Sequence, residues 1–141
     1  MKKVFALLTL AVALQGCTTS LIEGQKRELE TYSQKGLEVQ ERRPGVAAAL
    51  GVLPMAGYFY TGHYVLAFTT LPLYPFLGPL WMPFDNYDAA QARNYYATKT
   101  SVERARAQAL RANDREADDK HIDEITHRRN QRDIEDKYSA Y

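Results

Sequence analysis

Residues Pro44–Phe84 read PGVAAALGVLPMAGYFYTGHYVLAFTTLPLYPFLGPLWMPF, and this stretch decides the fold. It contains no Asp, Glu, Lys or Arg, and His63 is its one readily titrating side chain. Polar residues recur in it with neither the helical period of 3.6 nor the strand period of 2, although a soluble domain has elements with one face in water. The stretch therefore predicts a membrane-associated segment.

The polar triplet Thr61-Gly62-His63 divides this segment into two apolar arms, Val46–Tyr60 and Tyr64–Trp81. If the first arm is helical, it is about 22 Å long, which is less than the roughly 30 Å of a hydrocarbon core. The second arm contains three prolines, which we expect to break a helix: Pro72, Pro75 and Pro79. Tyrosine and tryptophan rings prefer the headgroup level. We expect an apolar hairpin that lies at the membrane interface or enters it shallowly, with a bilayer-crossing hairpin as the alternative.

The hairpin carries an aromatic and glycine motif, Gly57-Tyr58-Phe59-Tyr60-Thr61-Gly62, with Trp81 and Asp85 near the end of its second arm. This motif resembles the two-transmembrane hairpin domain, the TM-two family, and more closely the small bacterial lipoproteins that carry it. The resemblance covers roughly residues 44–99. It departs from the family pattern at Tyr58, where a basic residue is frequent, and at Met55, where glycine is usual. The resemblance implies membrane association and implies no reaction. The motif residues are Gly57, Tyr58, Phe59, Tyr60, Gly62, Trp81 and Asp85.

The N-terminus predicts a secretory signal peptide over residues 1–16. Lys2 and Lys3 precede an apolar run from Val4 to Leu14, and the run closes on Leu14-Gln15-Gly16-Cys17. The closing residues resemble the lipobox of bacterial lipoproteins, which implies cleavage before Cys17 and acylation of that residue. By the same resemblance, Thr18 in place of Asp favours the outer membrane, facing the periplasm, over the inner membrane. The alternative is a secreted protein with an incidental cysteine.

Residues 17–43 predict a lipidated segment with one short helix. Ser20 and Glu23 have capping-box spacing, and Gly36 can adopt the left-handed conformation that ends a helix. The alternation in Leu37–Glu41 indicates a short extended piece. Arg42 and Arg43 follow at the edge of the apolar block, where they either reach lipid phosphates or are ordinary flanking charges.

Residues 85–141 predict a polar helical tail. Asp88 and Gln91 give a second cap signature, and the chain beyond reads as one long helix or two shorter ones. A narrow stripe of small residues follows: Val102, Ala105, Ala109 and Ala112. The tail is either solvated or binds a protein partner or a second copy of the chain.

Composition excludes several classes of function. The 18 Lys and Arg nearly balance 17 Asp and Glu, so nothing indicates nucleic-acid binding. The single cysteine excludes an intrachain disulfide framework. His121, Glu124 and His127 do not converge well enough on a helix to predict a metal site. No phosphate loop or nucleophile elbow occurs, and we expect no cofactor.

The sequence as a whole predicts a mainly α, lipid-anchored protein with a short N-terminal helix, an apolar hairpin rich in aromatic residues, Pro and Gly, and a long polar C-terminal helix. We expect a non-enzymatic envelope lipoprotein that binds membrane lipid through acylated Cys17 and through the hairpin. The alternative is a small pore or transport accessory made of oligomerised hairpins. Gly45, Gly51 and Gly57 recur every six residues. The four-residue step would place glycines on one face of a helix, so their spacing disfavours the pore.

Overall fold

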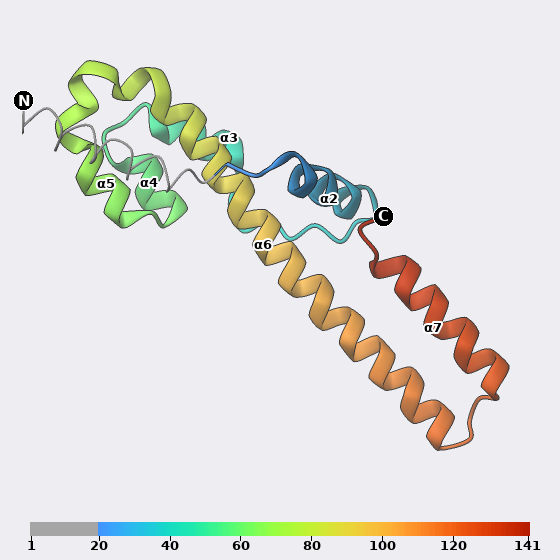
Figure 1. Cartoon of the computed structure of the whole chain (residues 1–141). Coiled ribbons are helices and arrows are strands. Elements are labelled where there is room, and N and C mark those ends of the chain that lie inside the picture. The colour runs from blue at the N-terminus through green and yellow to red at the C-terminus, as the bar shows by residue number, and fades with distance from the viewer. Residues whose placement is uncertain (1–19) are drawn as a thin grey trace, which may run out of the picture. The chain divides into compact units, whose positions relative to one another are not determined.

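The computed structural model describes residues 20–141, apart from the side chains of Leu73, Phe76 and Leu77. This part of the chain is mainly helical and contains no strand, as the sequence predicted (Figure 1). Its contacts define two compact units. The described residues of unit 1 are Ser20, Leu21 and Arg42–Ala92, and unit 2 contains Ile22–Glu41 and Arg93–Tyr141. The signal peptide and Cys17 lie outside the described residues.

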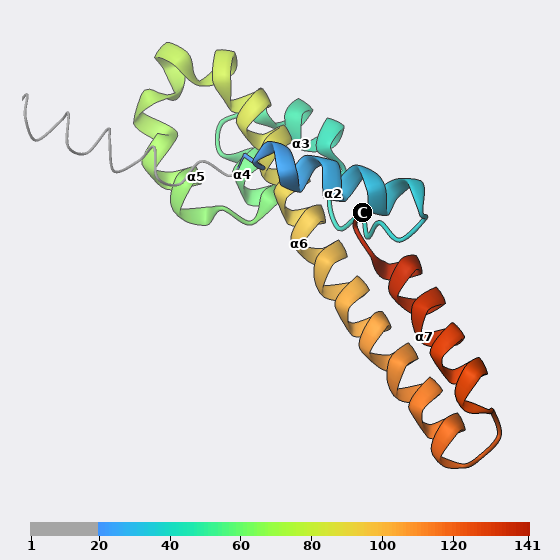
Figure 2. The same ribbon diagram turned by 45° about the vertical axis from the view of Figure 1, so that its right-hand side comes forward.

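Unit 1 consists of short helices followed by the start of a long one (Figures 1 and 2). They are α3 (Pro44–Gly51), α4 (Ala56–Thr61), α5 (Tyr64–Thr70), the 3-10 turn η1 (Leu71–Leu73) and the first part of α6 (Tyr74–Asp118). Tyr58, Ala67 and Met82 form the buried apolar centre, and Met55, Leu66, Tyr74 and Trp81 pack against it. Across residues 20–141, no helix is both long enough and apolar enough to span a membrane.

The predicted turn between the two arms is confirmed. Helix α4 ends at Thr61 and α5 begins at Tyr64, with Gly62 between them at a φ of 83°. Glycine adopts this left-handed conformation without the steric cost that a Cβ brings.

The first arm does not form one continuous helix. Helix α3 ends at Gly51, and Met55 adopts a φ of 63° before α4 begins. Pro54 explains the break, because proline lacks a backbone N–H and disfavours helical geometry in the residue before it.

The expectation that Pro79 breaks the second arm is wrong. Pro72 lies in η1 and Pro75 at the start of α6, but Pro79 and Pro83 lie inside α6, which continues to Asp118. Each internal proline costs about 3 kcal/mol. Helix propagation on both sides offsets this cost, because each added residue contributes a backbone hydrogen bond.

Helix α6 also passes through the expected boundary between the apolar hairpin and the polar tail, at residues 84 and 85. Asp88 therefore caps no helix, contrary to the predicted second cap. Alanines at positions 89, 90 and 92 favour continuation, because alanine has the highest helix propensity.

Unit 2 contains α2 (Glu23–Gln34), the later part of α6 and α7 (Glu124–Tyr138). The tail therefore forms two helices, and both views show α7 beside α6 (Figures 1 and 2). The Asn113 side-chain amide donates to the His127 carbonyl at 3.1 Å, and Arg106 pairs with Glu135 at 3.5 Å. Val102 is buried and Ala105 and Ala109 are half-buried, but Ala112 is exposed, so the predicted stripe is correct except at its last residue.

Helix α2 ends as the sequence predicted and begins later than it predicted. Gly36 has a φ of 68°, its N–H binds the Ser33 carbonyl, and the Leu37 N–H binds the Tyr32 carbonyl. This is the Schellman arrangement. At the other end the helix begins at Glu23, and the Gln25 side chain accepts from the Ile22 N–H, so Ser20 is not the cap.

Candidate functional site

Unit 1 exposes large apolar side chains from all of its helical segments. Val65, Phe84 and Leu80 are 75%, 74% and 71% exposed. The other large exposed residues between α3 and η1 are Val46, Val52, Leu53, Phe59, Tyr64, Phe68 and Leu71. Because the sequence from Pro44 to Phe84 has no Asp, Glu, Lys or Arg, no formal charge interrupts this surface while His63 is neutral. We call these residues the apolar surface of unit 1.

Part of the apolar surface is an aromatic cluster on α4 and α5. The Phe59 ring lies 5.7 Å from that of Tyr64 and 5.8 Å from that of Phe68, between ring centroids. Tilted and edge-on rings at this separation attract one another. The exposed rings therefore form a patch with a defined arrangement.

The interior of unit 1 holds polar groups. The Tyr58 hydroxyl donates to Asp85 Oδ2 at 2.7 Å, and Tyr58 itself is only 2% exposed. Burial, followed by the hydrogen bond to Asp85, raises the pKa of Tyr58 well above its usual value, while a hydrogen bond from Trp81 acts in the opposite direction. Three of the predicted motif residues thus meet at one hydrogen-bonded point.

Further polar side chains are buried beside this point. The Thr61 hydroxyl donates to the Gly57 carbonyl at 3.1 Å, and the Asn86 amide donates to the Met82 carbonyl at 2.8 Å. Thr61 and Asn86 are both fully buried. Unit 1 therefore buries polar groups beside its apolar centre, while many of its large apolar side chains are exposed. A large exposed apolar surface is the informative departure from a soluble domain.

Two glycines allow α3 and α4 to approach α6 closely. A Cβ on Gly51 would lie 2.8 Å from the Met82 carbonyl oxygen, and a Cβ on Gly57 would lie 2.5 Å from Asn86 Cγ. Gly51 and Gly57 are six residues apart, but the turn at Met55 brings both onto the same stretch of α6. They are therefore used for packing within unit 1. Gly45 has no atom within 4 Å of its Cβ position.

The structure brings together most of the predicted motif. Gly57 and Tyr58 face α6, Tyr60 accepts from the Arg43 backbone N–H at 3.0 Å, and Phe59 is exposed in the aromatic cluster. Gly62 forms the turn, while Trp81 and Asp85 contact Tyr58. Cys17 is the one predicted site residue outside the described part of the chain. The sequence did not single out Gly51 or Asn86 as site residues. For Gly51, the available signal was a glycine within an apolar helix.

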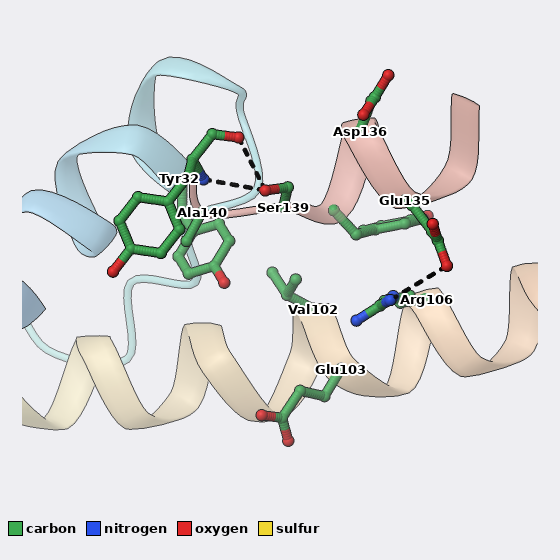
Figure 3. Close-up of a pocket in the computed structure, with 10 residues that line it drawn as sticks. Tyr32, Val102, Glu103, Arg106, Glu135, Asp136, Ser139 and Ala140 are labelled. Carbon is green, nitrogen blue, oxygen red and sulfur yellow. Dashed lines mark hydrogen bonds and ion pairs between the residues drawn. The ribbon is translucent and has the colours of Figure 1, made fainter. Parts of the chain in front are cut away.

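Unit 2 has a groove of about 380 Å³ between α2, α6 and the end of α7 (Figure 3). Tyr32 and Val102 form its buried side, and the Arg106–Glu135 ion pair lies at one edge. The Glu103 and Asp136 side chains point away from the groove in Figure 3. The wall therefore mixes rings and aliphatic groups with charged and polar groups, and no convergent set of catalytic groups is seen in the view.

Unit 2 is held together by contacts between residues far apart in the chain. The Tyr95 hydroxyl donates to Glu28 at 2.7 Å, and the Val39 N–H donates to the Thr98 hydroxyl at 2.9 Å. Lys35 Nζ donates at 2.8 Å to the carbonyls of Asp136, in the last turn of α7, and Ser139, the C-cap of that helix. Nothing in the local pattern predicted these pairs.

The residues considered for a metal site are separated by the local structure. His121 precedes α7, Glu124 begins it and pairs with Arg128, and His127 contacts Asp114 at 3.0 Å. Residues 20–141 hold no group of three or more His, Cys, Asp or Glu side chains arranged to bind a metal ion.

Comparisons with protein-family models, with curated proteins and with solved structures find no match to this chain. The resemblance to the two-transmembrane hairpin lipoproteins accordingly remains a prediction from its motif.

Proposed function

We propose that this protein is a non-enzymatic lipoprotein of the bacterial cell envelope, anchored through acylated Cys17 and seated on the membrane by unit 1. The observation that carries the proposal is the exposed and uncharged apolar surface of unit 1. Its exposed surface is apolar and free of formal charge from Pro44 to Phe84, whereas Tyr58, Thr61 and Asn86 place their polar groups inside. Contact with lipid relieves the cost of exposing such a surface to water.

The proposal includes a periplasmic role for unit 2 as a module that binds a protein partner or a second copy of the chain. Its charged helices and mixed groove support this part. The outer membrane is the favoured location, because Thr18 rather than Asp follows Cys17 in the lipobox-like motif.

The first experiment tests the anchor. Cells that express the full chain are grown with labelled fatty acid, and the wild type is compared with Cys17→Ser. We expect label on the wild type alone. Label that persists in Cys17→Ser would overturn the anchor assignment.

The second experiment tests the apolar surface. In a Cys17→Ser background, Val65→Asp places a charge on a side chain that is 75% exposed, so the fold is retained and lipid contact is weakened. The matched control is Ile125→Asp in unit 2, where the side chain is 78% exposed. We expect Val65→Asp alone to move protein from the membrane fraction to the soluble fraction. Equal fractionation of both variants would contradict the seating of unit 1 on the membrane.

A further inference from the structure

A pair of cations, Arg42 and Arg43, lies at the edge of the apolar surface of unit 1. Residues 44–92 contain no Lys or Arg, and the first acidic residue after the two arginines is Asp85. Asp85 accepts the hydrogen bond from Tyr58. The segment from Arg42 to Phe84 therefore carries a formal charge of +2, all of it at one end.

Helix α4 holds this pair in place. The Arg42 guanidinium lies over the Tyr60 ring, 5.2 Å from its centroid, and the Arg43 backbone N–H donates to the Tyr60 hydroxyl. A cation over an aromatic face is attracted by the ring quadrupole. The Arg42 guanidinium and the Arg43 backbone are thus held on the unit that carries the aromatic cluster.

The Arg43 side chain is available to an external anion. It is exposed, and no ion pair joins it to another residue in the described part of the chain. Glu41, the nearest acidic residue in sequence, pairs instead with Arg93 at 2.9 Å. Val46, three residues after Arg43, is itself 40% exposed, so the cation lies beside apolar surface.

We propose that unit 1 selects anionic phospholipids, with Arg42 and Arg43 binding the headgroup phosphate while neighbouring apolar side chains contact the acyl region. This inference rests on the proposed membrane seating of unit 1. A guanidinium matches phosphate with paired N–H donors, and basic residues next to exposed apolar side chains are typical of proteins that bind charged lipid surfaces. Each arginine near an anionic surface strengthens binding by about fivefold, so the pair contributes about thirtyfold.

The test uses the full chain with Cys17→Ser, so that binding is reversible. Trp81, the only tryptophan, lies in unit 1 and is half-buried, so its emission reports contact of that unit with lipid. The protein is titrated with vesicles of phosphatidylcholine alone and with vesicles that also contain phosphatidylglycerol. We expect tighter binding to the anionic vesicles, decreasing as salt is raised.

The deciding variant is Arg42→Gln/Arg43→Gln, which keeps the backbone contact to Tyr60. We expect it to lose about thirtyfold in affinity for anionic vesicles and little for neutral ones. The matched control, Arg104→Gln/Arg115→Gln, removes two exposed arginines from unit 2 and should change neither affinity. Arg42→Lys/Arg43→Lys should keep most of the selectivity, since it preserves the charge.

The outcomes separate this inference from the proposed function. Equal affinity of the wild type and Arg42→Gln/Arg43→Gln for anionic vesicles would overturn the lipid selectivity and leave the seating of unit 1 intact. The lipid selectivity would also be overturned, with the seating of unit 1 left intact, if free inorganic phosphate at matched ionic strength abolished the difference in affinity between anionic and neutral vesicles. No response of Trp81 to either kind of vesicle would overturn the seating itself.

Discussion

Replacing Gly51 by alanine tests the close approach of α3 to α6. The new Cβ would lie 2.8 Å from both the Met82 carbonyl oxygen and Pro83 Cα. Carbon atoms normally approach to about 3.5–4.0 Å, so the helices must separate by about 1 Å. The obstacle is backbone and cannot rotate away. Overpacking of this kind costs about 1–3 kcal/mol.

Gly45→Ala is the matched control, because Gly45 lies on the same helix with no atom within 4 Å of its Cβ position. Both substitutions add the helix preference of alanine, about 1 kcal/mol, so their difference isolates the clash. We expect Gly51→Ala to have a free energy of unfolding about 1–3 kcal/mol below that of Gly45→Ala. The assay is urea unfolding of the Cys17→Ser chain in detergent, followed by Trp81 emission.

Equal stability of the two variants would refute the described contact between α3 and α6. Gly57→Ala offers a second case, in which the obstacle is the buried Asn86 side chain. Adding Asn86→Ala to Gly57→Ala should restore part of the lost stability, because it removes the obstructing side chain. Adding Asn86→Ala to Gly51→Ala should not, because the obstacle there is backbone.

Three further predictions concern the helix ends and Tyr58. Gly36→Ala should lower the free energy of unfolding by roughly 1–2 kcal/mol, because its φ of 68° is strained for alanine, whereas Gly24→Ala should not lower it; urea titration compares them. Because the pKa of Tyr58 is raised in the folded protein, the neutral phenol stabilises the fold below about pH 10, and this stabilisation is lost as the pH rises further. In a pH titration followed by phenolate absorbance, Tyr58→Phe should lack one group that titrates late in the wild type. Asp123→Ala should speed amide exchange at Thr126, because the Asp123 carboxylate accepts a hydrogen bond from the Thr126 N–H. Hydrogen bonds from Thr126 lower the pKa of Asp123, so acid that protonates this carboxylate should speed the same exchange in the wild type. Unchanged exchange at Thr126 would contradict this cap.

Features set by a few neighbouring residues could be predicted from the sequence. The turn at Gly62 and the end of α2 at Gly36 were both correct, because only glycine adopts a positive φ at little cost. The mainly helical fold and the apolar character of residues 44–84 also follow from local composition.

Features set by contacts across the chain could not be predicted from the sequence. Met55 adopts a positive φ without being a glycine, and this turn brings Gly51 and Gly57 to the same stretch of α6. The passage of α6 through Pro79 depends on the whole helix rather than on the residue. The candidate site was therefore predicted as a set of residues, while the Tyr58–Asp85 contact required the structure.

The exposed apolar surface of unit 1 also has a calorimetric consequence. Removing apolar surface from water lowers the heat capacity, whatever covers that surface. Hydrophobic attraction weakens on cooling, whereas the attraction between an arginine and a phosphate does not depend on apolar hydration. Attachment through Val65, Leu80 and Phe84 should therefore carry a negative heat-capacity change and loosen in the cold, so temperature separates the part of the attachment made by these side chains from the part made by charge.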